Sequence, residues 1–313
     1  MALPRIYTDE NAAREHLEAL LWPNGPTCPH CGNTDEKRIT KLQGNSTRPG
    51  VYKCKECRKP FSVTVGTVFE RSHIPLNQWV YAVSLLASSK KGISSHQIHR
   101  TLGVTYKTAW FMTHRIREAM RALGMTPLGG DGEVVEVDET YYGPIEKPRS
   151  KNTRGQKFTK GGKSGPSNKR AIVSLVQRGG SVRSFHVAVA DQDTVQNIVC
   201  QNVLAETRLH TDESRLYHGA DSVFAAHETV KHSRKEYVRG DVHTNTIEGY
   251  FSIFKRGMRG NYQHCKEKHL HRYLAEFDFR YNNRIALGVN DEMRAARALQ
   301  GISGKRLTYR RTH

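Results

Sequence analysis

The sequence has no long hydrophobic run: nowhere do 18 apolar residues stand together, as a membrane-spanning helix requires. Charges interrupt the first 22 residues throughout, so they do not contain the continuous apolar segment of a secretion signal. These absences predict a soluble protein that stays in the cytoplasm and has no membrane partner. We also find no internal repeat, which excludes a solenoid or an array of identical modules.

Acidic residues are scarce relative to basic ones. The chain has 30 Asp and Glu against 49 Lys and Arg, which gives a formal net charge of +19. A surface of this kind attracts polyanions, and nucleic acid is the leading candidate. A membrane surface is the alternative, but the basic residues are not confined to an amphipathic helix with a broad apolar face.

Cysteine is also uncommon, with six residues in 313, yet four of the six form a pattern. They make two Cys-x-x-Cys pairs, Cys28 with Cys31 and Cys54 with Cys57, separated by 22 residues. Two such turns present four thiolates tetrahedrally to Zn²⁺, and a site with four protein ligands is structural. Two disulfides are the alternative, which a reducing compartment disfavours. Cys200 and Cys265 stand alone and are expected to be unreactive.

Hydrophobic periodicity divides the chain into four parts and predicts a multidomain α/β architecture. Residues 1–72 read as a helix followed by the β-rich cysteine module, and residues 73–127 as a small helical unit. Residues 128–290 alternate strands and helices around a basic loop, 144–170, which carries nine Lys or Arg against one Glu. Residues 291–313 read as a basic C-terminal tail.

The helical unit has the layout of a helix-turn-helix motif, with a tight turn at Gly103. The second helix is expected to begin near Thr105. Its first residues would then contact base edges in the major groove, namely Tyr106, Lys107 and Thr108. An ordinary helical hairpin with exposed charges is the alternative, because many small bundles share this pattern.

Three acids of the α/β part fall where metal ligands are expected. Asp138 closes an alternating strand, Asp212 ends a short strand, and Glu248 lies on the polar side of an amphipathic helix. If the strands are neighbours and the helix packs beside them, the carboxylates converge, and bound cations relieve their repulsion. Oxygen ligands with open positions suit Mg²⁺ or Mn²⁺.

Other interpretations of these acids remain open at this point. Asn245 followed by Glu248 also fits a reciprocal helix cap, in which the glutamate satisfies a backbone donor. In addition, Asp138 could be replaced in the cluster by Glu136 or Glu139, and Asp212 by Glu213.

Three segments resemble the catalytic segments of bacterial insertion-sequence transposases of the zinc-ribbon, ISXO-like group. These are VEVDETYYG, TDES and HTNTIEGYFSIFKRGMRGNYQHCKEKHLHRYLAEFDFRYNNR. The resemblance covers nearly the whole chain, because that group also has an N-terminal Cys-x-x-Cys ribbon followed by a helical DNA-binding unit. It implies that residues 128–290 form a ribonuclease-H-like domain of the DDE type.

The resemblance carries specific residues onto this sequence. It implies that Asp138, Asp212 and Glu248 hold two Mg²⁺ or Mn²⁺ ions, and that Lys255, seven residues after the third acid, contacts DNA near them. Since the third acid is sometimes Asn in this group, Asn245 is a further candidate catalytic residue. Arg256 and Arg259, with the basic loop, are expected to neutralise DNA phosphates.

The implied activity is cleavage and joining of DNA strands by two-metal phosphoryl transfer, in a homodimer or larger assembly that pairs two transposon ends. The zinc ribbon and the helix-turn-helix unit would recognise the terminal repeats of double-stranded DNA in the nucleoid. Two rivals remain, a DNA-binding regulator that uses the same modules and a nuclease of the same fold without strand transfer.

Overall fold

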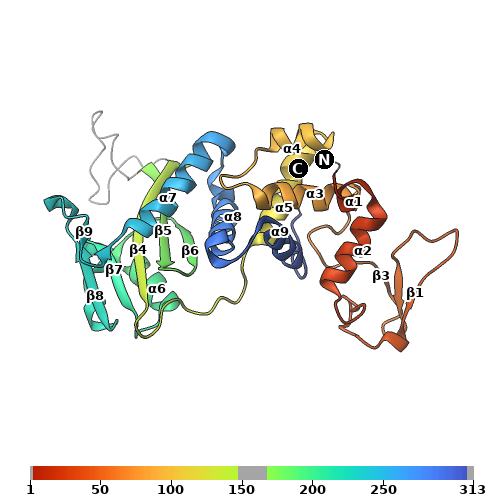
Figure 1. The fold of residues 1–313 in the computed structure, drawn as a ribbon, viewed down its shortest axis with the longest axis horizontal. Helices are drawn as coiled ribbons and strands as arrows, with labels where there is room; N and C mark the ends of the chain where they lie inside the picture. The colour runs from red at the N-terminus through yellow and green to blue at the C-terminus, as the bar shows by residue number, and fades with distance from the viewer. Residues whose placement is uncertain (1–2, 147–167, 309–313) are drawn as a thin grey trace. The chain divides into compact units, whose positions relative to one another are not determined.

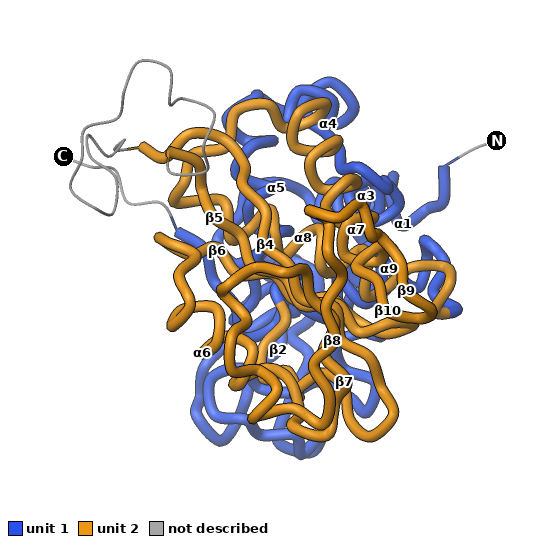
Figure 2. The backbone as a smooth tube through the Cα atoms, turned by 90° about the vertical axis from the view of Figure 1, so that its left-hand side faces the viewer, with its two compact units in different colours: residues 1–121, 288–313 blue, residues 122–287 orange. Residues whose placement is uncertain are grey.

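The computed structural model describes residues 3–146 and 168–308. The chain divides into two compact units, coloured separately in Figure 2. Unit 1 consists of residues 1–121 together with 288–313, and unit 2 of residues 122–287. Most of the predicted basic loop, residues 147–167, lies outside the described residues.

Unit 1 begins with two helices and a small β-sheet. The helices are α1, Arg5–Thr8, and α2, Glu10–Leu21, and the strands are β1, Ile39–Lys41, β2, Tyr52–Cys54, and β3, Pro60–Phe61. The strands form an antiparallel sheet in the order β1-β2-β3. Its core contains few residues, and two of them are cysteines: Cys28, Ile39, Tyr52, Cys54 and Phe61. A module this small needs a further source of stability.

Four helices complete unit 1: α3, Leu76–Ser88, α4, Ser95–Leu102, α5, Tyr106–Met120, and α9, Asp291–Gln300. Helix α9 contacts α2, α3 and α5. The segment 291–313, which the charges suggested to be a basic tail, therefore contains a packed helix. Its apolar side is formed by small residues that hydrophobic periodicity detects poorly, with Ala295, Ala298 and Leu299 buried.

Unit 2 contains a five-stranded sheet in the order β6-β5-β4-β7-β8. Its strands are β4, Val134–Pro144, β5, Lys169–Gln177, β6, Val182–Val187, β7, Arg208–Asp212, and β8, Ala226–Val230. β5 runs antiparallel to β4 and β6, whereas β7 is parallel to β4 and β8. β5 and β6 form a hairpin whose turn contains Gly179, with φ of 67°. A small hairpin of β9, Val238–Arg239, and β10, Val242–His243, follows β8.

Helices cover both faces of this sheet (Figure 1). Helix α6, Gln192–Asn202, packs through Val195 and Val199 on one face. Helices α7, Asn245–Gly257, and α8, Leu270–Asn282, pack on the other through a core rich in aromatic residues. The prediction of a mixed α/β protein is confirmed. None of the helices in the described ranges is long and apolar enough to span a bilayer.

Candidate functional site

Two of the predicted acids lie side by side because β4 and β7 are parallel neighbours. Their register pairs Glu136 with His210. Two residues further along each strand stand Asp138 and Asp212. β7 ends at Asp212, so both carboxylates lie at the carboxyl end of a parallel strand pair, where open α/β sheets bind ligands.

The third acid, Glu248, reaches the same region from α7. The apolar side of this helix is buried on the sheet through Ile247, Phe251 and Phe254, which turns Glu248 toward the neighbouring polar side. Its side chain keeps 47% of its surface exposed, and its Oε1 lies 3.9 Å from Nε2 of His232. The helix thus presents the carboxylate to solvent at the sheet edge.

The alternative role of Glu248 as part of a helix cap is wrong. α7 begins at Asn245 with Thr244 as its N-cap residue, so Asn245 is already helical. The Glu248 carboxylate accepts a hydrogen bond from the Thr244 hydroxyl at 3.2 Å, not from the Asn245 backbone. The local sequence leaves the first backbone N–H groups of α7 without a side-chain cap from Thr244.

The three acids interact electrostatically. Burial, together with the carboxylates of Glu139, Asp212 and Glu248, raises the pKa of Asp138 to about 8. Each of these carboxylates disfavours the ionised form of Asp138. Within the described part of the chain, however, only four cysteines have ligand atoms that all lie within 4.8 Å of one another. Repulsion keeps like charges apart unless a cation lies between them.

The neighbouring acids that could have replaced the predicted ones have other partners. Glu139 accepts a hydrogen bond of 2.6 Å from the buried Tyr217 hydroxyl, and burial raises its pKa. Glu213 accepts hydrogen bonds from the backbone and hydroxyl of Ser233 at 2.9 and 2.8 Å. Tyr217 was missed by sequence reasoning because nothing local connects it to Glu139.

Glu136 is completely buried and also has partners of its own. Its carboxylate accepts hydrogen bonds from Arg178, from the Thr246 hydroxyl and from the Ile247 backbone N–H. It therefore holds the beginning of α7 and is not available in place of Asp138.

Three basic residues follow Glu248. Lys255 is half-buried on α7, and its Nζ lies 5.9 Å from the centre of the Phe251 ring. Burial lowers the pKa of Lys255, and the Asp138 carboxylate opposes that shift. Arg256 and Arg259 are exposed, and Arg256 Nε donates to the Ser252 carbonyl at 3.2 Å.

The four predicted zinc ligands come together in unit 1. Sγ of Cys28 lies 3.6 Å from Sγ of Cys57, and Sγ of Cys31 lies 3.7 Å from Sγ of Cys54. Sulfur atoms at tetrahedral positions about 2.3 Å from zinc would stand about 3.8 Å apart, whereas a disulfide requires about 2.05 Å. Backbone N–H groups of Cys57 and Glu56 lower the pKa of Cys54 to about 6, which favours the thiolate that zinc binds. The cluster fits a structural zinc ion.

The predicted DNA-reading residues lie at the start of α5. Gly103, with φ of 66°, makes the tight turn after α4, and Thr105 caps α5 through the Thr108 backbone N–H. Tyr106 is 46% exposed and stacks on His96 at 4.3 Å between ring centres. Lys107 is exposed, and the Thr108 hydroxyl bonds that of Thr105 at 2.9 Å.

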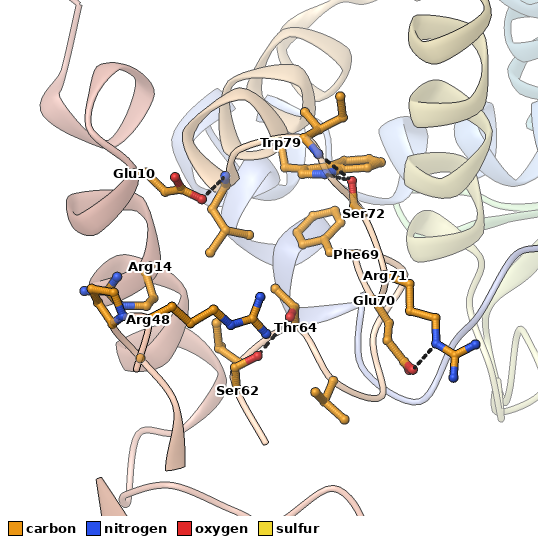
Figure 3. Close-up of a pocket in the computed structure, with 16 residues that line it drawn as sticks. Glu10, Arg14, Arg48, Ser62, Thr64, Phe69, Glu70, Arg71, Ser72 and Trp79 are labelled. Atoms are coloured by element: carbon orange, nitrogen blue, oxygen red, sulfur yellow. Dashed lines mark hydrogen bonds and ion pairs between the residues drawn. The ribbon is translucent and has the colours of Figure 1, made fainter. Parts of the chain in front are cut away.

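A cavity of about 290 Å³ lies within unit 1, between α2, the ribbon and the start of α3 (Figure 3). Its two acids have protein partners, since Glu10 accepts from the Leu76 N–H and Glu70 from the Gly66 N–H. Arg14 Nη1 donates to Asn11 at 2.7 Å. Arg48, by contrast, has no hydrogen-bond or ion-pair partner among residues 3–146 and 168–308.

Comparison with known proteins matches both units. A model of the ISXO2-like transposase domain matches residues 127–282, which include all three predicted acids, and a model of the transposase zinc-ribbon domain matches residues 8–60. A protein in transposable element ISH50 of Halobacterium salinarum is 29% identical over 282 residues, 88% of this chain and 92% of that protein. The chain therefore belongs to the insertion-sequence transposases in which a zinc ribbon accompanies an ISXO2-like DDE transposase domain.

Proposed function

We propose that this transposase binds the terminal inverted repeats of its insertion sequence and catalyses metal-dependent DNA cleavage and strand transfer. One observation carries the proposal: Asp138 stands beside Asp212 in the parallel register, and Glu248 on α7 acts electrostatically on Asp138. Gathered carboxylates suit Mg²⁺ or Mn²⁺, which accept oxygen ligands and keep open positions. The mixed sheet with helices on both faces supports a ribonuclease-H-like fold.

Asp138 is the central ligand in this proposal, because both other acids act on it. Asp138 would hold the divalent ions together with Asp212 and Glu248. Such ions, when bound, activate the attacking oxygen and stabilise the leaving oxygen of a phosphodiester. The chain itself orients the acids, and no covalent intermediate with the protein is required.

DNA phosphates would be held by cations around this centre. Lys255 interacts electrostatically with Asp138 and would contact the phosphate next to the cleaved bond. Arg256 and Arg259 are exposed on the following turn and would contact phosphates further along the strand. Asn245, on the first turn of α7, is an additional candidate for the site.

Sequence recognition would come from unit 1. Helices α4 and α5, joined by a tight turn, support the assignment of a helix-turn-helix motif whose second helix offers Tyr106, Lys107 and Thr108 at its beginning. Arg14 and Arg48 line the cavity beside α2 and would contact a backbone phosphate there. Such contacts position DNA without reading its sequence.

The active form is proposed to be a homodimer or larger assembly, because two transposon ends must be joined in one reaction. It would act on double-stranded DNA in the nucleoid. The ribbon and the helical unit would recognise the transposon ends, and the DDE domain would carry out the chemistry.

The test uses purified full-length protein, Mg²⁺, DNA carrying a transposon end and a target plasmid. We expect nicking at the end and joining of the new 3′-hydroxyl to the plasmid. Asp138→Ala, Asp212→Ala and Glu248→Ala should each lose both reactions by at least two orders of magnitude, by analogy with the removal of other essential catalytic groups. Glu133→Gln, which alters an exposed acid near the start of β4, is the matched control and should retain both.

The rival functions give different results in the same assay. A DNA-binding regulator would bind the end and leave it intact at every Mg²⁺ and Mn²⁺ concentration. A nuclease without transposition activity would cleave the end but form no plasmid joint. Either outcome would overturn the proposed strand transfer.

A further inference from the structure

Glu136 is a buried acid that the proposed metal site does not use. It lies on β4 two residues before Asp138, and none of its side chain is exposed. An ionised carboxylate tolerates such burial only when paired and hydrogen-bonded. Both its oxygens have protein donors, so Glu136 has a task within the fold.

The partners of Glu136 come from the beginning of α7. Oε1 accepts a hydrogen bond from the Thr246 hydroxyl at 2.8 Å, and Oε2 accepts one from the Ile247 backbone N–H at 3.0 Å. Ile247 belongs to the first helical turn, whose N–H groups have no partner inside the helix. Because the N-cap residue Thr244 supplies no side-chain cap, the strand supplies a carboxylate instead, which also suits the positive end of the helix dipole.

Arg178 adds a second connection at the same place. Its Nε donates to Glu136 Oε1 at 2.7 Å, its Nη1 to the Asp241 carbonyl at 2.6 Å, and its Nη2 to the His243 carbonyl at 2.9 Å. The guanidinium group therefore links β4 to the backbone immediately before α7. His210 and His243 complete its environment, since each Nδ1 lies near Nη2, at 3.1 and 2.9 Å.

We propose that Glu136 and Arg178 form a clamp that positions Glu248 opposite Asp138. Asp138 is two residues beyond Glu136 on β4, and Glu248 directly follows Ile247 on α7. A single carboxylate thus fixes the backbone of one proposed metal ligand relative to another. Both clamp residues are positioning residues and not metal ligands. This inference rests on the proposed function of Asp138 and Glu248.

The first test needs neither metal nor DNA. In Glu136→Gln, amide hydrogen exchange of residues 245–249 should become about 10- to 100-fold faster, as expected for loss of a hydrogen bond to a charged group. Exchange in the β5–β6 hairpin should stay unchanged. Glu133→Gln is the control for charge, since Glu133 is exposed and makes no contact with α7 among its hydrogen bonds.

A second pair of variants perturbs the fold less and therefore keeps the test valid if Glu136→Gln misfolds. Thr246→Val removes one hydrogen bond to Glu136 from a partly exposed residue, whereas Thr246→Ser keeps the hydroxyl. The valine variant should speed exchange at residues 247–249 and the serine variant should restore wild-type exchange. If amide exchange in Thr246→Val and in Glu136→Gln equals exchange in the wild type, the clamp is overturned.

The second test measures Mn²⁺ binding to the full chain by electron paramagnetic resonance. Glu136→Gln should bind Mn²⁺ at least tenfold more weakly than the wild type, and DNA nicking should recover at high Mn²⁺ concentration. A variant that was merely unstable would bind Mn²⁺ with wild-type affinity at a temperature where it is folded, so the affinities are compared there. Unchanged Mn²⁺ affinity in Glu136→Gln, with wild-type binding abolished by Asp138→Asn, would refute the positioning role.

The two levels of the proposal fail differently. If the wild type binds no Mn²⁺ and nicks no DNA, the proposed function is wrong. The exchange measurements then still decide whether the clamp holds α7.

Discussion

Removing zinc should unfold the ribbon while leaving unit 2 folded. Ile39, Tyr52 and Phe61 join two of the cysteines in the buried core of the module, and Trp22 and Val65 pack against it. Each fully buried apolar side chain contributes about 1.5–3 kcal/mol, whereas a structural zinc ion contributes about 10–16 kcal/mol. The zinc term is thus the largest single contribution, and it is comparable to the whole stability of an ordinary domain, about 5–15 kcal/mol.

The assay combines chelation, zinc analysis and limited proteolysis. After zinc loss, cleavage should appear between residues 28 and 61, and affinity for transposon-end DNA should fall. Cys54→Ser should reproduce both effects, because Cys54 is buried among the four ligands. Cys200→Ser makes the same chemical change at an exposed cysteine outside the cluster and should have neither effect. Verified zinc loss with unchanged protease resistance and DNA affinity would refute this reasoning.

Four further predictions follow from individual side chains. Arg48→Ala should weaken DNA binding equally for all sequences and reduce the salt slope by about one unit, whereas Arg5→Ala, outside the cavity, should not change the slope. Lys255→Ala should slow nicking with little change in Mn²⁺ affinity, and Lys255→Arg should restore the nicking rate. Equal nicking rates in the wild type, Lys255→Ala and Lys255→Arg would contradict this. Asn245→Ala should lower Mn²⁺ affinity less than tenfold, in contrast to Glu248→Ala, and a complete loss would make Asn245 an essential ligand. Burial raises the pKa of Asp278 to about 6 from 3.8, so the native state keeps a proton that the unfolded chain has lost between these values. Asp278 should therefore contribute a fall of about 3 kcal/mol in stability as pH rises from 3.8 to 6, and urea unfolding of Asp278→Asn should lack that contribution.

Local patterns were sufficient to locate the strands and helices that carry the site. Apolar and polar residues alternate along the strand that ends at Asp138, and apolar residues recur at helical spacing around Glu248. Both patterns involve residues close together in the sequence, so they can be recognised without knowledge of the fold. The Cys-x-x-Cys pairs are equally local, because each pair forms one turn of the zinc cluster. The four sulfur atoms accordingly lie together as predicted.

Long-range pairing could not be predicted in the same way. β4 and β7 are neighbours although two strands and a helix separate them in the chain. No periodicity reveals that Asp212 will stand beside Asp138 and not at another edge of the sheet. The resemblance to a transposase family suggested this convergence, and the parallel register supplies a physical reason for it.

Buried polar groups were the other feature hidden from sequence reasoning. Glu136 was considered as an alternative to Asp138, because both alternate to the same face of their strand. Its actual partners, Arg178, Thr246 and Ile247, are more than 40 residues away along the chain. The position of a charge in the sequence shows the face on which it lies but not whether another segment will satisfy it.

The most direct test of the account is anomalous X-ray diffraction from crystals of the full chain soaked in Mn²⁺. We predict anomalous density about 2.0–2.3 Å from carboxylate oxygens of Asp138, with Asp212 and Glu248 as further ligands, and no such density in Asp138→Asn. If millimolar Mn²⁺ leaves no density among these three acids, the claim that they gather divalent ions for DNA chemistry is contradicted.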